Sequence, residues 1–128
     1  MRLLLDTHAL LWWLAGDAAL SAVSRRAIAS ERNDVLVSAV SAWEIATKHR
    51  LGKLPDAASV AAGIERTIAD QGFVPLAISL HHGQAAGALP GPLRDPFDRM
   101  LMAQAIIEDL VLVSNEKVFD AYGVKRLW

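Results

Sequence analysis

The sequence contains no cysteine. This absence excludes disulfide bonds, cysteine-ligated zinc sites and thiol nucleophiles. The chain also lacks any apolar run of the roughly 20 residues that a membrane-spanning helix needs. The first such run is interrupted by Asp6 after only three leucines, so we recognise no signal peptide. We therefore expect a cytoplasmic protein without a membrane contact.

An excess of charge of one sign is also missing. Thirteen Lys and Arg residues balance fourteen Asp and Glu residues, and the net charge is −1. Such a balance argues against a protein that binds nucleic acid through its overall charge, although local basic patches remain compatible with it. No internal repeat or low-complexity tract divides the chain, and 53% of its 128 residues are hydrophobic. We expect residues 1–128 to form a single domain with one sizeable core.

Short apolar runs alternate with helical segments along the chain. We expect strands at residues 3–5, 35–37, 73–76, 110–113 and 124–128. We expect helices at residues 8–15, 21–30, 40–51, 56–72, 79–88, 95–108 and 116–122, with Asp56 as the cap of the fourth. The apolar runs show no alternation of polarity, as in strands buried on both faces. The pattern predicts an α/β fold, a three-layer α/β/α sandwich around a parallel sheet of about five strands.

Four acidic residues occupy comparable places in this pattern. Asp6 directly ends the first strand, and Glu44 lies about two turns into the helix after the second. Asp98 lies in the first turn of a helix that leads back to the sheet, and Glu116 follows the strand at 110–113. With right-handed crossovers, all four side chains should meet at the carboxyl edge of the sheet, where open α/β sheets bind ligands.

Converging carboxylates repel one another in a partly dry cleft. A hard divalent cation such as Mg²⁺ or Mn²⁺ takes oxygen ligands and would relieve this repulsion. Such a cation can acidify a water and polarise a phosphoryl oxygen. The four acids therefore predict metal-dependent hydrolysis of a phosphodiester.

Each acid also has a simpler interpretation. Asp6 is well placed to cap the helix that follows, and taken alone its two interpretations are equally good. Glu44 lies four residues before Lys48, the spacing of a surface ion pair worth about 0.3 kcal/mol. Asp95 is the expected cap of the helix that contains Asp98, and an acid in a first turn complements the helix dipole. Four independent caps or pairs would not explain their convergence.

Several polar residues near the acids are candidates for auxiliary roles. Ser114 is placed either to orient a water or carboxylate or to cap the next helix, and Thr7 and Asp95 are possible partners of the site. Arg94 and Arg99 flank the acidic helix start, where they could contact RNA phosphate or pair with the nearby aspartates. Lys48 is a further candidate for contact with RNA, although it belongs to a small basic group of a kind that is more often only a solvated face. The tryptophans at 12, 13 and 43 are expected to divide between the core and a partner surface.

Four stretches of the chain resemble the PIN-domain ribonucleases, and VapC-type toxins of bacterial type II toxin–antitoxin modules in particular. They are LLLDTHALLWWL, VSAVSAWEIATKHRLGKL, DPFDRMLMAQA and LVSNEKVFDAYGVKRLW. The resemblance runs in order from residue 6 to residue 128. It implies an α/β/α fold and an endoribonuclease that depends on Mg²⁺ or Mn²⁺. It also implies inhibition by a small cognate antitoxin and a homodimer within the complex.

The resemblance assigns four catalytic and metal-binding residues, namely Asp6, Glu44, Asp98 and Glu116. Ser114 matches the Ser or Thr that precedes the last acid in the family. Two departures are visible. Many relatives have Asp where this chain has the longer Glu116, and residues 91–94 read GPLR where relatives often carry a histidine.

Two other functions compete with this hypothesis. A phosphatase of the haloacid dehalogenase type also opens with an apolar strand ending in Asp, but it needs a second Asp two residues later, where this chain has His8. A non-catalytic PIN-like binding module would tolerate loss of Asp6 without change in toxicity. The complete set of four acids favours the nuclease.

Overall fold

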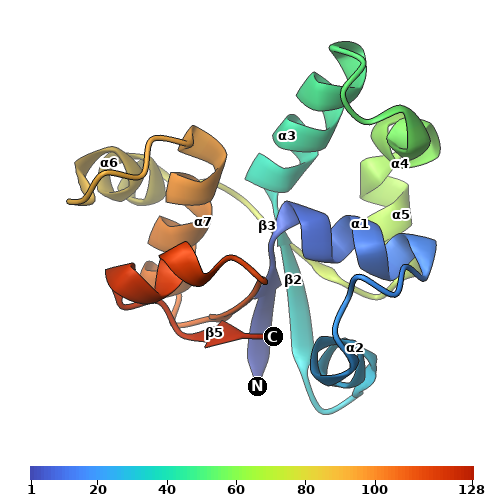
Figure 1. The fold of residues 1–128 in the computed structure, drawn as a ribbon, viewed down its shortest axis with the longest axis horizontal. Coiled ribbons are helices and arrows are strands. Elements are labelled where there is room, and N and C mark those ends of the chain that lie inside the picture. The colour runs from blue at the N-terminus through green and yellow to red at the C-terminus, as the bar shows by residue number, and fades with distance from the viewer.

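The computed structural model describes all 128 residues and shows a five-stranded parallel sheet with β1 at its centre (Figure 1). The order of the strands is β3-β2-β1-β4-β5, and every neighbouring pair is parallel. The strands are β1 (Arg2–Leu5), β2 (Asp34–Ser38), β3 (Val74–Leu76), β4 (Val111–Val113) and β5 (Arg126–Leu127). The predicted α/β class and the five parallel strands are confirmed.

Helices cover both faces of this sheet. They are α1 (Thr7–Ala15), α2 (Ala22–Ala29), α3 (Ala39–Arg50), α4 (Ala58–Ala62), α5 (Ile64–Asp70), α6 (Leu80–Ala88) and α7 (Pro96–Ile107). Two 3-10 turns, η1 (Pro55–Ala57) and η2 (Lys117–Tyr122), complete the fold. In Figure 1, α1, α2, α4 and α5 lie on one side of the sheet and α6 and α7 on the other, while α3 rises beyond its carboxyl edge. No helix of the structure is long and apolar enough to cross a membrane.

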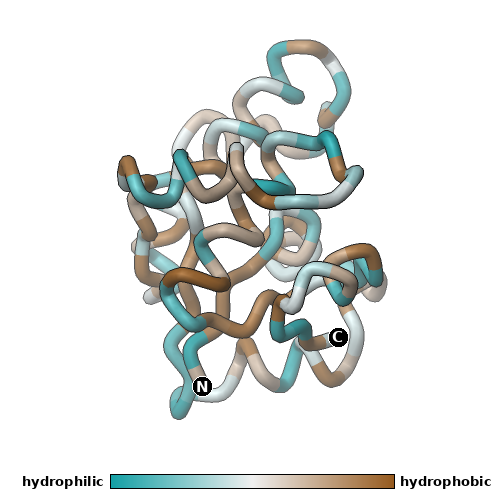
Figure 2. The backbone as a smooth tube through the Cα atoms, turned by 90° about the vertical axis from the view of Figure 1, so that its left-hand side faces the viewer, coloured by the Kyte–Doolittle hydropathy of each residue, from teal (hydrophilic) through white to brown (hydrophobic).

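The central strand explains why both faces must be covered. Leu3 and Leu5 belong to the apolar cluster on the α1 side, whereas Leu4 belongs to the cluster on the α7 side. All three leucines are fully buried, and burial of each contributes about 1.5–3 kcal/mol. Hydrophobic stretches accordingly run through the middle of the molecule in Figure 2, with hydrophilic stretches at outer bends. A strand that is apolar on both faces can only lie in the interior.

Polar side chains start most of the long helices. Asp6, Ser21, Ser38, Ser79 and Asp95 each cap the helix that follows by accepting a backbone N–H with their side chain. Each such cap stabilises a helix by about 1 kcal/mol. Because Ser38 ends β2 and Asp6 follows β1 directly, their caps fix how α3 and α1 leave the same sheet edge.

The prediction of one continuous helix at residues 56–72 is wrong. The chain forms η1, then α4, and then a separate helix α5 after a break at Gly63, whose φ of −152° and ψ of 51° are not helical. Asp56 makes no capping hydrogen bond, because Pro55 and Asp56 lie inside the 3-10 turn. Glycine is among the residues least favourable to helix, which explains the position of the break.

Candidate active site

Asp6 lies at the carboxyl end of the central strand and is 6% exposed. Its backbone N–H donates to the carbonyl of Val113 at 3.1 Å, which continues the β1–β4 ladder by one residue. Its Oδ1 accepts the backbone N–H of Ala9 at 2.7 Å and so caps α1. Capping and placement at the sheet edge, the two interpretations of Asp6, are therefore both present in one side chain.

Glu44 is held from two sides. One carboxylate oxygen accepts the hydroxyl of Thr7 at 2.6 Å, and Thr7 Oγ1 lies 3.0 Å from Ser41 Oγ. The other oxygen pairs with the Lys48 ammonium one helical turn further on. Glu44 is only 5% exposed, so the pair with Lys48 is not the surface ion pair that the spacing suggested. Thr7 joins α1 to α3 through this contact.

Asp98 reaches the same edge from the other layer. Asp95 caps α7, its Oδ1 accepting the backbone N–H groups of Phe97 at 2.8 Å and Asp98 at 3.2 Å. The expected roles of Asp95 as cap and Pro96 as first helical residue are confirmed. The Asp98 side chain itself is partly buried and makes no hydrogen bond within the protein.

Glu116 follows β4 and is exposed. Between the two, Ser114 is fully buried, and its Oγ accepts the backbone N–H of Glu116 at 3.0 Å. The Ser114 hydroxyl also lies close to Asp6 and lowers the pKa of its carboxyl, in opposition to burial. Ser114 thus fixes the turn that carries one acid while contacting another.

The charges of the acids act on one another. Burial raises the pKa of Asp98 to about 7, and the negative charges of Asp95, Glu44, Glu116 and Asp6 add to this rise. A carboxyl that is half protonated near neutral pH indicates a partly buried group surrounded by further negative charges.

The pKa of Asp6 is shifted by the same kinds of influence. Burial raises its pKa and the charge of Glu116 adds to the rise, whereas Ser114, the Ala9 amide and His8 act in the opposite direction. These influences show that Asp6, Glu44, Asp98 and Glu116 share one region of the molecule.

The donor set suits a hard cation, since all four side chains offer carboxylate oxygens. In the present arrangement, however, no three Asp, Glu or His side chains are close enough to hold a metal ion together. The contacts of Glu44 account for part of this, because Thr7 and Lys48 occupy its two oxygens. Binding of a cation by the whole set would require side-chain movement, such as exchange of Lys48 for the cation.

Comparison with known families identifies the fold. The family model described as PIN domain matches residues 3–125, which is nearly the whole chain. The chain belongs to the PIN-domain family. A phosphatase of the haloacid dehalogenase type is thereby not supported, and the residue that this alternative would need as an acid is the exposed His8.

This PIN domain is similar to a named ribonuclease and, in fold, to solved toxin–antitoxin structures. Ribonuclease VapC16 of Mycobacterium tuberculosis is 39% identical over 69 residues, which are 54% of this chain and about half (48%) of that protein. Among solved structures, VapBC2 from Rickettsia felis bound to a promoter DNA fragment matches with a TM-score of 0.72 at 14% identity, over 99% of this chain and 98% of the other. VapC20 of M. tuberculosis, a toxin that cleaves the sarcin-ricin loop, matches with 0.67 at 20% identity, over 95% of each chain.

Arg99 has a structural role in the PIN domain. Its guanidinium donates to the carbonyls of Ala86 at 2.9 Å and Leu93 at 2.7 Å, and also to that of Leu89. It ties the loop before α7 to α6 and forms no ion pair with the aspartates. Arg94 is exposed and remains available.

Three features of the site were not expected from sequence. Ser41 hydrogen-bonds to Thr7, the partner of Glu44, and its position one turn before Glu44 on α3 was the available signal. The second is a buried chain in which Gln104 accepts from Ser38 at 2.5 Å and lies 3.4 Å from His82. It links the start of α3 to α7. The third is an aromatic contact between Trp43 and Phe97.

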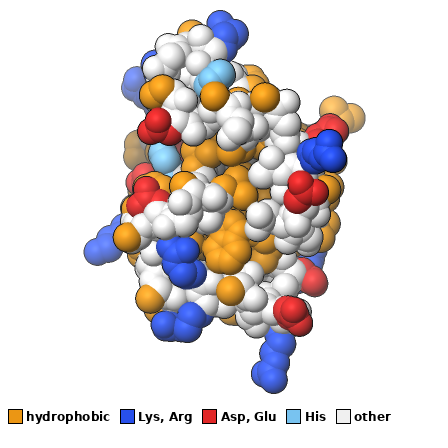
Figure 3. Space-filling view, turned by 90° about the vertical axis from the view of Figure 1, so that its right-hand side faces the viewer, with side chains coloured by type: hydrophobic (Ala, Val, Ile, Leu, Met, Phe, Trp, Pro, Cys, Tyr) orange, Lys and Arg blue, Asp and Glu red, His pale blue; other side chains and the backbone are white.

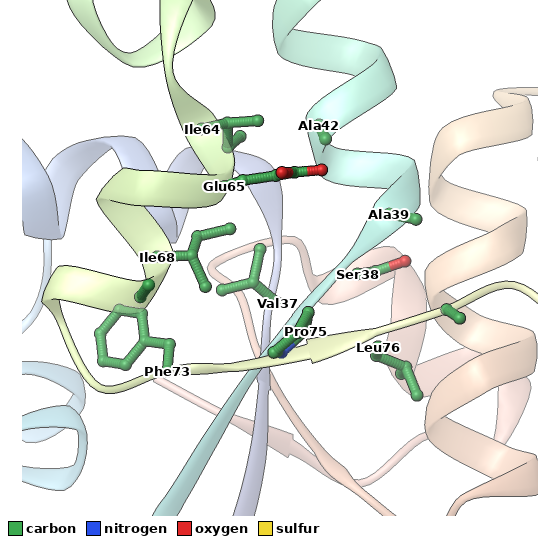
Figure 4. A pocket seen from close by; sticks show the side chains of 12 residues that line it. Val37, Ser38, Ala39, Ala42, Ile64, Glu65, Ile68, Phe73, Pro75 and Leu76 are labelled. Carbon is green, nitrogen blue, oxygen red and sulfur yellow. The ribbon is translucent and has the colours of Figure 1, made fainter.

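An apolar groove of about 530 Å³ lies next to α3, between it and α5 (Figure 4). Ala39 and Ala42 line it from α3, Ile64 and Ile68 from α5, and the Glu65 carboxylate reaches across it toward Ala42. Figure 3 shows hydrophobic side chains gathered along the middle of the face formed by the α1 layer, with charged residues around them. Trp12 and Trp13 are partly buried against this layer's core. Such a surface suits an apolar protein segment.

Proposed function

We propose that this PIN domain is a metal-dependent endoribonuclease and the toxin of a type II toxin–antitoxin module, acting in the cytoplasm as a single domain of residues 1–128. The observation that carries the proposal is the mutual influence of four carboxylates at one sheet edge, expressed in the raised pKa of Asp98. The likeness to Ribonuclease VapC16 supports an activity on RNA.

Asp6, Glu44, Asp98 and Glu116 would hold Mg²⁺ or Mn²⁺. Asp98 and Glu116 offer carboxylates without hydrogen bonds to other residues, and Glu44 becomes available when Lys48 is displaced. A divalent cation, when bound, supplies a Lewis acid that polarises the phosphoryl group and acidifies the attacking water. Cation binding favours the ionised form of Asp98 and so requires a proton to leave it below about pH 7.

The side chains around the acids have positioning roles in this proposal. Thr7 and Ser41 orient Glu44, while Ser114 orients Asp6 and the backbone before Glu116. Asp95 holds Asp98 at the first turn of α7 and adds negative charge beside it. Hydrolysis joins a water oxygen to phosphorus and breaks one phosphorus–oxygen bond of the RNA backbone. Lys48, once released by Glu44, and Arg94 are candidates to contact phosphates.

Cleavage of RNA by the purified protein tests this proposal. We expect cleavage with Mg²⁺, none with EDTA, and none by the Asp6→Asn variant with Mg²⁺. Asparagine caps a helix as well as aspartate does, so circular dichroism should show an unchanged fold. Equal cleavage by Asp6→Asn and wild type would refute the nuclease, and so would cleavage that persists in EDTA.

The partner in this proposal is a small antitoxin, and the toxin itself would be a homodimer in the complex. The support is that several similar folds are those of toxin–antitoxin complexes, including VapBC-1 from Haemophilus influenzae and VapBC from Salmonella typhimurium. The apolar groove between α3 and α5 offers a place for an apolar antitoxin segment.

Substitution inside the groove tests the partner. Ala42→Glu should place a charge in the apolar groove and weaken the complex with the proposed antitoxin at least tenfold. Ala46→Glu, on an exposed position of the same helix, is the matched control. Equal affinity of the two variants would remove the groove from the antitoxin interface.

A further inference from the structure

Trp43 stands out among the exposed side chains. It is 57% exposed, and it is the only aromatic residue among the exposed large hydrophobic side chains. Exposure of an indole to water is unfavourable, because tryptophan gains the most free energy when its ring is covered. Packing in the core therefore does not explain why a tryptophan stands at this exposed position.

Contacts connect Trp43 with the acidic site. Its ring lies 4.7 Å from that of Phe97, between centroids, with an interplanar angle of 71°. Lys48 Nζ lies 5.9 Å from the centroid of Phe97 and pairs with Glu44. Phe97 directly precedes Asp98 and Trp43 directly precedes Glu44. The aromatic pair thus bridges α3 and α7, which carry two of the four acids.

We infer that Trp43, supported edge-to-face by Phe97, is a stacking platform for one unpaired nucleobase of the RNA substrate. Proteins recognise single-stranded RNA by stacking splayed-out bases on aromatic rings, with cations nearby for the backbone. Phe97 restricts the Trp43 ring, so less rotational freedom is lost when a base stacks on it. The inference rests on the proposed ribonuclease activity and adds a binding subsite to it.

Two observations favour RNA over a protein at this position. The apolar groove faces α5 through Ala39 and Ala42, whereas Trp43 contacts Phe97 of α7, so the platform is separate from the groove. Its surroundings are charged, since Lys48 is in contact with Phe97 and both Asp95 and Asp98 act on Lys48. An isolated aromatic pair with a cation beside it suits a base followed by its phosphates better than an apolar protein surface.

Binding of a fluorescein-labelled 12-nucleotide single-stranded RNA tests the inference. Fluorescence polarisation is measured with Mg²⁺ in an Asp6→Asn background, which prevents cleavage during the titration. We expect Trp43→Ala to raise the Kd about tenfold, the usual size of a lost base-stacking contact. Trp43→Phe should stay within about threefold, because a smaller ring remains. Leu80→Ala removes another exposed hydrophobic side chain, 95% exposed on α6, and should leave the Kd unchanged.

A scan of abasic sites along the RNA identifies the base. One abasic position should weaken binding to the protein with Trp43 and have no further effect with Trp43→Ala. Unchanged affinity of Trp43→Ala, lack of any RNA binding, or equal abasic penalties in both proteins would overturn the inference. So would a change from dimer to monomer in sedimentation with an unchanged Kd, which would make Trp43 a contact between copies. If the base-specific binding is found but wild type cleaves no RNA, the proposed nuclease fails and the subsite stands.

Discussion

The two halves of the acidic site differ in how their carboxylates are satisfied. On the α1 and α3 side, Asp6 caps a helix and Glu44 is bound by Thr7 and Lys48. On the α7 and β4 side, the carboxylates of Asp98 and Glu116 have no hydrogen-bond partner, and the pKa of Asp98 is raised to about 7. The first half is held by the fold, whereas the second is left electrostatically unbalanced. A fold that places unbalanced acids beside organised ones favours a cation as the missing partner.

Glu44 gives the strongest test of this comparison, because it belongs to the organised half and yet is proposed to act in catalysis. If it acts in catalysis, Glu44→Gln should lower the rate of RNA cleavage about 1000-fold, as expected for loss of several kcal/mol of transition-state stabilisation. Glu31→Gln, an exposed substitution far from the site in sequence, is the control for the same chemical change. If the cleavage rate is unchanged and only stability falls, Glu44 is a structural partner of Lys48.

Thr7 tests how far the organised half depends on its hydrogen bonds. Thr7→Val keeps the shape but removes the donor to buried Glu44, and should lower the free energy of unfolding by about 2 kcal/mol. Thr7→Ser retains the hydroxyl and should lose clearly less. Urea unfolding of the two variants gives both values, and a larger loss in Thr7→Ser than in Thr7→Val would mean that the methyl group, not the hydroxyl, matters here.

The pKa of Asp98 makes stability depend on pH in the unbalanced half. In the folded protein this pKa is about 7, against 3.8 for the unperturbed group, so between these values the folded state holds a proton that the unfolded chain has lost. The resulting stabilisation is complete below about pH 4 and disappears as pH rises through 7.

Asp98→Asn removes this dependence. From pH 5 to pH 8 in EDTA, wild type should therefore lose about 1–2 kcal/mol of unfolding free energy relative to Asp98→Asn, less than the full shift implies because water screens the site. Parallel profiles of unfolding free energy against pH for the two proteins would show that the pKa of Asp98 is not raised in the folded state.

Asp95 separates capping from charge and gives the smallest expected effect. Asp95→Ala should cost about 1 kcal/mol through loss of the cap on α7. Asp95→Asn should keep the cap and its stability while lowering the pKa of Asp98, because a neighbouring negative charge is gone. Carboxyl NMR titration of Asp98 in both variants checks this, and an unchanged pKa would contradict the proposed influence of Asp95.

Much of this fold could be predicted because its determinants are local. An apolar run that ends in Asp6 defines the central strand, and Asp95 starts α7 as the expected N-cap. The parallel order of the strands then brings the four acids to the same edge. The break at Gly63 could not be placed, because a single glycine inside a helical pattern is often tolerated.

The contacts of the site were less predictable. The spacing of Glu44 and Lys48 indicated their pair but not its burial, which depends on how α1 and α7 pack against α3. Arg99 next to two aspartates suggested phosphate or carboxylate as its partner, yet three loop carbonyls take its donors. The contact of Trp43 with Phe97 likewise joins residues 54 positions apart and depends on tertiary packing. The catalytic roles of the four acids remain predictions.

RNA cleavage by Asp98→Asn measures the central claim most directly. Labelled RNA is incubated with Mg²⁺ and either wild type, Asp98→Asn or the exposed control Asp70→Asn, and the products are resolved and their ends sequenced. The acidic site predicts cleavage at the same positions by wild type and Asp70→Asn, and at least a 1000-fold slower reaction for Asp98→Asn. Cleavage by Asp98→Asn at the rate and positions of wild type would contradict it.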